Sequence, residues 1–291
     1  MYKQTFKFCF KTVESTCRKG KFMESDSYIK TLLDSGPIRD PVLRKIIQDI
    51  HLPAGSEGLD AGCGIGLITL MLAETVGEKG FVTGIDIIPE FLQYGEKAAA
   101  RSGVSDHVTF QKCDILAGLP FSDHTLDWVW SIDCLGYLGE IASIMEELKR
   151  VVKPGGKVFV LAWTSQLILP GYPVLEARLN ATSSSYIPVQ QERNMESQFM
   201  RLPYWFKIAG LESIRGQTFV GEVLSPLSHG ERTALQSLFE MVWGLPQPGE
   251  SPEIRKEYIR LCTPGSPDYI LDLPGYYAFF TYTLFQGTMP E

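Results

Sequence analysis

Short apolar segments alternate with amphipathic segments through the middle of the chain, from residue 53 to residue 163. The apolar segments, of which Val158–Trp163 is the clearest, are continuously hydrophobic. Such strands are typical of a parallel sheet that is covered on both faces. The segments between them have the 3.6-residue spacing of helices. This order of strand and helix predicts right-handed β-α-β crossovers and therefore an α/β fold.

Turn-forming residues and helix caps set the bounds of these elements. Asp40 is expected to cap a first helix that begins at Pro41 and buries the apolar residues through Ile50. A Pro-Gly-Gly turn at residues 154–156 leads into the fifth strand. The expected strands are Gly58–Ala61, Gly80–Asp86, His107–Lys112, Thr125–Ser131 and Lys157–Trp163, and the helices between them are Leu67–Thr75, Pro89–Arg101 and Ile141–Val152.

The regular alternation stops after Trp163. Two irregular blocks, 164–200 and 224–274, hold short helical patterns between proline and glycine joints, and strands are expected at Glu212–Val220 and Tyr276–Phe285. We expect both blocks to form a helical lid over an apolar substrate pocket, or else to pack on a neighbouring subunit. The predicted organisation is an N-terminal helical extension or lid (1–52), a core (53–223 and 275–291, with 164–200 partly cap) and a helical insertion (224–274).

A glycine loop follows the first strand, with the spacing D-x-G-x-G-x-G from Asp60 to Gly66 through Gly62 and Gly64. Enzymes that bind dinucleotides need G-x-G-x-x-G, and the third glycine of that pattern would fall on Leu67. A carboxylate beside the loop would repel a pyrophosphate, whereas it favours an ammonium group. The loop therefore predicts a ligand with an amino-acid moiety and no phosphate.

Acids end the next two strands as well. Asp86 lies 20 positions after Gly66, where a carboxylate can accept hydrogen bonds from both hydroxyls of a ribose. Asp114 ends the third strand, where its carboxylate and the following backbone N–H can contact an adenine amino edge. Ile87 and Ile115 are placed to sandwich the adenine ring.

Together these segments resemble the class I S-adenosylmethionine-dependent methyltransferases, in the small-molecule branch that includes ubiquinone and menaquinone methylases. The resemblance runs from Gly58 to Val160 and weakly to Leu211. It rests on LDAGCGIG (Leu59–Gly66), VTGIDI (Val82–Ile87), KCDI (Lys112–Ile115), LPFSDHTLDWVWSIDCLGYL (Leu119–Leu138) and LKRVVKPGG (Leu148–Gly156).

The resemblance implies a Rossmann-like, seven-stranded, mostly parallel sheet with an antiparallel last strand and helices on both faces. It implies S-adenosylmethionine as the cofactor, with S-adenosylhomocysteine as its product. The cofactor would lie against the glycine loop, including Cys63, and against the strand-end residues Asp86, Ile87, Asp114 and Ile115. Ser131 would offer its carbonyl to the methionine ammonium. Where relatives often carry a His pair this chain has Gly136 and Tyr137, so no histidine is available there as a base.

Methyl transfer from a sulfonium is an in-line displacement that depends mainly on aligning the nucleophile. We expect Asp133 and Tyr137, after the fourth strand, to contact a small, partly apolar acceptor. Helix capping and ring packing are their alternative roles. Tyr28 would cover the cofactor from an N-terminal lid, or else pack within a helix. The thiols of Cys63 and Cys134 are expected to fill space. The alternative functions are aminopropyl transfer on the same fold and a catalytically silent cofactor-binding protein.

Composition limits the classes of molecule that this chain is expected to bind. The 291 residues carry a net charge of -7 without a long cationic stripe, so nucleic acid is not an expected partner. No apolar run approaches the roughly 20 residues that span a bilayer, and the N-terminus lacks the apolar core of a secretory signal. Six scattered cysteines without paired spacing predict free thiols, no metal site and a cytoplasmic location. A homodimer is an open expectation.

Overall fold

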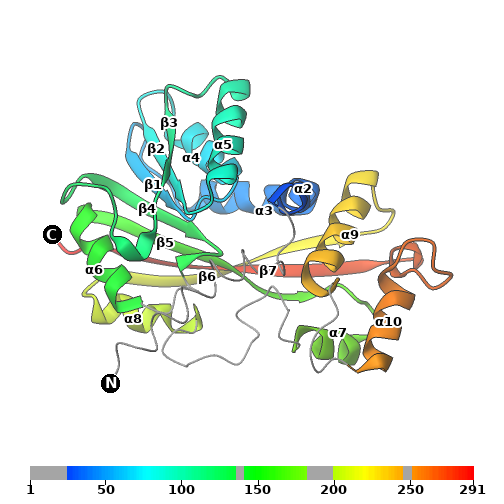
Figure 1. Cartoon of the computed structure of the whole chain (residues 1–291). Helices are drawn as coiled ribbons and strands as arrows, with labels where there is room; N and C mark the ends of the chain where they lie inside the picture. The colour runs from blue at the N-terminus through cyan, green and yellow to red at the C-terminus, as the bar shows by residue number, and fades with distance from the viewer. Residues whose placement is uncertain (1–24, 136–140, 182–198, 245–250) are drawn as a thin grey trace.

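A computed structural model describes residues 25–135, 141–181, 199–244 and 251–291. Seven strands in these ranges form one sheet in the order β3-β2-β1-β4-β5-β7-β6 (Figure 1). Every neighbouring pair from β3 to β5 is parallel, and β7 runs antiparallel to both β5 and β6. The strands are β1 (Glu57–Ala61), β2 (Phe81–Asp86), β3 (Val108–Lys112), β4 (Leu126–Ile132), β5 (Val152–Leu167), β6 (Glu212–Leu224) and β7 (Tyr277–Thr288).

The expected fold class is therefore confirmed, and the main difference lies in strand length. β5, β6 and β7 have 16, 13 and 12 residues, whereas β1 to β4 have between 5 and 7. β5 was expected to end at Trp163 and β6 at Val220, but β5 pairs with β7 as far as Leu167 and β6 pairs with it as far as Leu224. The three long strands run past the end of β4 and reach the helices of the irregular blocks (Figure 1).

Helices cover both faces of the sheet, as two separate hydrophobic clusters show. One cluster joins the N-terminal helices, α4, α5 and α9 to one face, and the other joins α6 and α8 to the opposite face. The helices are α2 (Ser25–Asp34), α3 (Gly36–Asp49), α4 (Leu67–Val76), α5 (Pro89–Ser102), α6 (Ile141–Val151), α7 (Pro173–Asn180), α8 (Leu202–Ile208), α9 (His229–Trp243) and α10 (Pro252–Cys262).

The expected start of the first helix was wrong. α3 begins at Gly36, so Pro41 lies inside the helix and Asp40 is not its cap. Pro37 occupies the first turn of α3, where a missing N–H costs nothing. Pro41 lies near the start of the helix, so most of the backbone hydrogen bonds of α3 form after it. The expected buried face is present, since Leu43, Ile46 and Ile47 are all buried.

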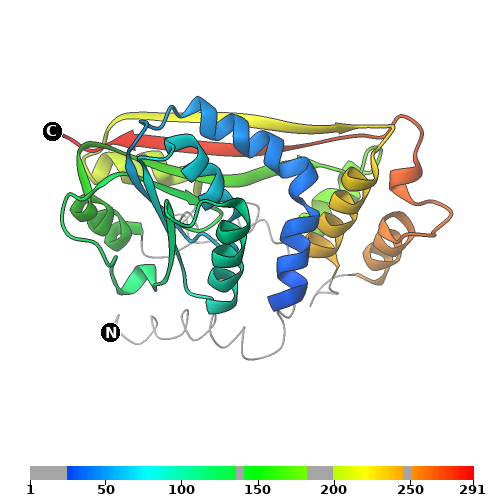
Figure 2. The ribbon, with the colours of Figure 1, turned by 90° about the horizontal axis from the view of Figure 1, so that it is seen from above.

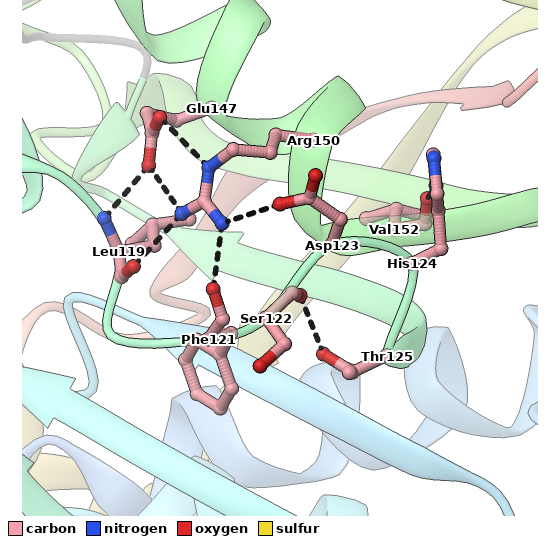
Figure 3. Close-up of polar contacts among 9 residues, drawn as sticks. All are labelled: Leu119, Phe121, Ser122, Asp123, His124, Thr125, Glu147, Arg150 and Val152. Carbon is pink, nitrogen blue, oxygen red and sulfur yellow. Dashed lines mark hydrogen bonds and ion pairs between the residues drawn. The ribbon is translucent and has the colours of Figure 1, made fainter.

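Two of the sequence motifs are joined by one arginine on α6. The Arg150 guanidinium donates to the carbonyl oxygens of Leu119 (2.9 Å) and Phe121 (2.6 Å) and pairs with Glu147 and Asp123 (Figure 3). These contacts fix the loop that leads into β4. The LPFSDH and LKRVV segments therefore occur together because they clamp one another, and their contacts position β4 rather than touch a ligand.

A buried hydrogen-bond chain attaches the cap helices to the long strands. Trp163 on β5 donates its indole N–H to Gln166 (3.1 Å), whose amide reaches Oδ1 of Asn180 at the end of α7 (3.5 Å). Trp243 at the end of α9 donates to the same Oδ1 (2.9 Å). The chain links β5, α7 and α9 and fixes α9 above the sheet, beside α2 and α3 (Figure 2).

Candidate functional site

A cavity of about 380 Å³ opens where β1, β2 and β4 end and the long strands continue. The glycine loop, Asp86 and Asp133 line one part of it. Tyr28, Leu32, Arg39 and Asp40 line it from α2 and α3, and Trp163 and Tyr282 from β5 and β7. α9 closes the apolar side with Leu238, Met241 and Val242. The position matches the place where ligands bind in open α/β sheets, at the carboxyl ends of the strands.

The three glycines of the loop have different reasons to be glycine, although all three have a positive φ. A Cβ on Gly62 would lie 2.3 Å from the Cys134 sulfur, and one on Gly66 would lie 2.5 Å from the Phe110 ring. A Cβ on Gly64 would meet nothing within 4 Å, and Gly64 lines the cavity. Gly62 and Gly66 thus allow close packing, whereas Gly64 leaves a bare stretch of backbone open to a ligand.

We therefore expect Gly64→Ala to impair mainly cofactor binding and Gly62→Ala to impair mainly stability. Gly64→Ala costs about 1–2 kcal/mol for its left-handed backbone and leaves the fold intact, but its methyl group enters the cavity and weakens cofactor binding. Gly62→Ala adds a clash with Cys134, so the loss of stability is larger. Thermal melting and calorimetry with S-adenosylhomocysteine would check both variants. A larger loss of melting temperature in Gly64→Ala would contradict this assignment.

Asp86 braces the glycine loop from the end of β2. Its carboxylate accepts the backbone N–H of Gly64 (2.9 Å) and that of Ile88 (2.9 Å). It is half-buried and lines the cavity, and burial raises its pKa. One carboxylate thus fixes the loop and remains exposed to a ligand.

Asp60 lies beneath the loop and does not line the cavity. Its carboxyl is fully buried; Oδ2 accepts a hydrogen bond from Thr69 (2.7 Å), and Oδ1 has no hydrogen-bond partner among the described residues. Burial raises the pKa of this carboxyl to about 7, with a smaller contribution from the negative charge of Asp86. A buried acceptor without a donor costs free energy, and a nearby cation would offset that cost.

The raised pKa of Asp60 predicts a pH effect on stability. The folded chain holds its proton up to pH 7 or so, whereas the unfolded chain releases it near the ordinary value of 3.8. The cofactor-free chain should therefore lose stability as the pH rises from about 4 to about 7. Asp60→Asn, which cannot ionise, should show a flatter dependence in thermal melts between pH 5 and pH 8. The variant keeps part of the slope, because burial also raises the pKa of Glu176 to about 7 and raises the pKa of Asp86 and of Asp40, all with the same sign. Equal slopes for the variant and the wild type would contradict the prediction.

Other residues expected to hold the cofactor do not line the cavity. Asp114 caps a short 3-10 helix by accepting the N–H of Leu116 (3.0 Å), and Ile115 is buried in that turn. The Ser131 hydroxyl donates to the carbonyl of Ala61 (2.9 Å) and accepts from the N–H of Leu135. Ile87 and Gly66 likewise lie outside the lining. Roles for these residues stay predictions.

Asp133 turns out of β4 with a positive φ of 48° and is exposed to the cavity. Its Oδ1 accepts the backbone N–H of Trp163 (2.8 Å), which fixes the carboxylate beside β5. Tyr137, the other expected catalytic residue, lies outside the described residues. Cys63 and Cys134 line the cavity, but burial raises the pKa of both thiols, so they remain protonated and fill space.

The N-terminal helices supply one expected and one unexpected residue. The Tyr28 ring stacks on Phe91 of α5 with the centroids 5.6 Å apart, and burial raises the pKa of its phenol. Arg39 donates its Nε–H to the Tyr282 hydroxyl (2.9 Å) and an η N–H to Ser35 (3.2 Å). The sequence analysis missed Arg39, Trp163, Tyr282 and the α9 side chains. A lone arginine at an N-terminal helix carries no motif, and nothing in the sequence places it beside residue 282.

These residues fit S-adenosylmethionine. Gly64 provides an uncovered cradle, Asp86 an accessible carboxylate at the end of β2, and Asp60 an acceptor that lacks a donor. Half-buried Arg39 places a positive charge in the same cavity, which the carboxylate of a methionine head group can pair with.

Known proteins resemble this chain in sequence and in fold. A family model described as "Methyltransferase domain" matches residues 53–205. The demethylmenaquinone methyltransferase of Lysinibacillus sphaericus (strain C3-41) is 31% identical over 191 residues, which cover 60% of this chain and 78% of that protein.

Among solved structures, a SAM-dependent methyltransferase from Aquifex aeolicus superposes with a TM-score of 0.50 at 20% identity, covering 90% of this chain and 99% of that one. The [4+2]-cyclase SpnF superposes with a TM-score of 0.51 at 19% identity, covering 85% of this chain and 80% of that one.

The matched family covers more than half of the chain, so the chain belongs to the S-adenosylmethionine-dependent methyltransferases. It is of the menaquinone methylase-like branch, and its cofactor is S-adenosylmethionine. The expected family, fold and cofactor are confirmed. α9 and α10 lie beyond the residues that the family model matches. No helix within the described ranges is long and apolar enough to cross a membrane.

Proposed function

We propose that this chain transfers a methyl group by in-line displacement to a small, partly apolar molecule bound between Trp163 and α9. The observation that supports this most directly is the division of one cavity into a polar end and an apolar end. The glycine loop and Asp86 form the polar end, while Leu238, Met241 and Val242 form the apolar end.

At the polar end, Asp86 would hold the ribose hydroxyls and the Gly64 backbone would lie against the cofactor. Tyr28 would cover the cofactor from α2. S-Adenosylmethionine, when bound, supplies a methyl group on a positively charged sulfur. The Arg39 guanidinium has N–H groups left after its bonds to Tyr282 and Ser35, and it lines the cavity. We assign these groups to the methionine carboxylate.

At the apolar end, Asp133 would contact the acceptor. Asp133 lines the cavity next to Trp163, whose backbone N–H donates to its Oδ1. A carboxylate there can take a proton or a hydrogen bond from the molecule that receives the methyl group. The apolar walls exclude water, so the acceptor is oriented mainly by shape and by these few polar groups.

An acceptor assay tests the proposal. Demethylmenaquinol is the first compound to try, because the relative from Lysinibacillus sphaericus is named for demethylmenaquinone. Transfer of a labelled methyl group to it, lost in Asp133→Asn, is the expected result. Binding of S-adenosylhomocysteine without methyl transfer to any apolar acceptor in a broad panel would contradict the proposal.

A second candidate is a different reaction on the same fold, and the solved [4+2]-cyclase shows that this fold is not restricted to methyl transfer. Aminopropyl transfer to polyamines would call for a cluster of acids in the cavity. The lining does include the acids Asp40, Asp86 and Asp133, but α9 presents Leu238, Met241 and Val242, and the positive charge of Arg39 disfavours a polycationic acceptor.

A further inference from the structure

The sheet ends in an open strand edge along β6. β6 is the last strand of the sheet, and among the described residues its one neighbouring strand is β7. Its 13 residues form the outer border of the sheet, the yellow strand at the top of Figure 2. Gly216 is exposed, and because a glycine has only backbone to expose, the edge is open there. The N–H and C=O groups along such an edge are a template for another strand.

β6 has few of the features that keep a strand edge from pairing. Prolines, lysines and bulges are the usual ones. Neither proline nor lysine occurs between Glu212 and Leu224, and the irregular pairing with β7 is confined to the residues between Glu212 and Arg215. From Arg215 onward the strand is regular, and its charged side chains are those of Arg215 and Glu222.

Exposed apolar side chains lie beside this edge, all on one face of the sheet. Val220 and Leu224 on β6 are 59% and 63% exposed, and Tyr277 on β7 and Leu167 on β5 are exposed as well. They share a face because Leu224 is opposite Tyr277, while Leu167 is opposite Phe279, two residues further along β7. An apolar patch that continues an open strand edge indicates a protein-binding surface.

The sequence of β6 fits a second copy of itself. Two identical antiparallel strands are related by a two-fold axis, so one residue faces its own counterpart. With Val220 on the axis, Thr218 faces Glu222 of the partner subunit, and Gly216 faces Leu224 of the partner subunit. This register opposes no like charges and places apolar side chains at its centre. An axis at Glu222 would instead set the two carboxylates against each other, which destabilises a pair of strands.

We propose that this chain forms a homodimer in which β6 pairs with β6 of a second copy, antiparallel about Val220. The two sheets then join into one, and the exposed apolar side chains of β6 from both copies meet at the axis. The cavity lies on the opposite face of the sheet, against α9, so the edge can pair without closing it. The dimer does not depend on the proposed function.

Analytical ultracentrifugation over a series of concentrations tests the dimer. The wild type should sediment with twice the mass of one chain. Val220→Lys sets two ammonium groups beside each other on the axis and should raise the dissociation constant of the dimer about 10-fold or more. Because the side chain is exposed, the variant should keep the wild-type affinity for S-adenosylhomocysteine. Ile259→Lys is the matched control: Ile259 is 52% exposed on α10, and its variant should dimerise as the wild type does.

Val220→Cys locates the contact. With oxygen as the oxidant and copper phenanthroline as its catalyst, two thiols that face each other lose two protons and two electrons and form a disulfide. The product is a covalent dimer on a non-reducing gel, and the wild type, with its 6 native cysteines, gives the background. Thr218→Cys is on the same face, but its counterpart lies about 14 Å away along the strands, so it should not crosslink.

A wild type that is monomeric at every concentration would overturn the inference. A dimer that Val220→Lys leaves intact would overturn it too, because the copies would then meet at another surface. Crosslinking of Thr218→Cys as complete as that of Val220→Cys would show random collision and would count equally against it.

Discussion

Asp86→Ala should abolish most cofactor binding, with an affinity loss on the order of 100-fold or more. The carboxylate has two tasks: it would accept the ribose hydroxyls, and it accepts the backbone N–H groups of Gly64 and Ile88. Hydrogen bonds to a charged group contribute about 1.5–3 kcal/mol each, so losing two ribose contacts accounts for the expected factor. Calorimetry with S-adenosylhomocysteine measures it.

The same variant should also lose affinity for 5′-methylthioadenosine, which keeps the ribose and lacks the amino-acid part. Asp106→Ala removes an exposed acid between α5 and β3 and serves as the control for net charge. Asp86→Asn keeps part of the loop contact and should fall between wild type and Asp86→Ala. An Asp86→Ala variant that binds both ligands as tightly as wild type would remove the ribose assignment.

Arg39→Met should weaken the binding of S-adenosylhomocysteine and leave the binding of 5′-methylthioadenosine almost unchanged. The guanidinium is half-buried in the cavity wall, and its remaining N–H groups are assigned to the methionine carboxylate. We expect S-adenosylhomocysteine to lose about 10- to 100-fold in affinity, because a charge-assisted contact disappears. The affinity of 5′-methylthioadenosine should change little, because it has no carboxylate. Met keeps much of the aliphatic bulk of the arginine, so the packing of α3 is preserved.

Arg44→Met is the matched control on the same helix. Arg44 pairs with Glu74 at 2.7 Å on the surface, where both side chains are 51% exposed, and such pairs contribute little. The Arg44→Met variant should bind both ligands as tightly as the wild type does. If Arg39→Met weakens 5′-methylthioadenosine as strongly as S-adenosylhomocysteine, Arg39 supports the cavity wall in general and the carboxylate assignment is wrong.

The polar end of the site could be predicted because its signals are local. Asp60 and Asp86 lie at the ends of β1 and β2, and Gly62 and Gly64 follow β1 at once; parallel neighbours bring these strand ends together by necessity. Even here the sequence could not separate the tasks of the glycines. Only the neighbouring Cys134 and Phe110 show that Gly62 and Gly66 allow packing, while Gly64 faces the open cavity.

Errors at the ends of elements have a similar cause. Pro41 was expected to start a helix because proline is common there, but α3 gains an earlier turn from Gly36 and Pro37. The extra length of β5 and β6 depends on pairing with β7, which is more than 50 residues further along the chain than the end of β6. Propensity within a window of residues does not contain that information.

By itself the sequence determined the sheet, the glycine loop and the cofactor, since each follows from a short pattern and the order of strands. The tertiary structure decided the apolar end, where the acceptor is proposed to bind. Arg39 and Tyr282 are 243 positions apart, and α9 reaches the cavity from an insertion between β6 and β7. These residues meet because the three long strands continue past β4 and carry Trp163 and Tyr282 beneath α9. That extension depends on pairing between distant strands, which no local pattern encodes.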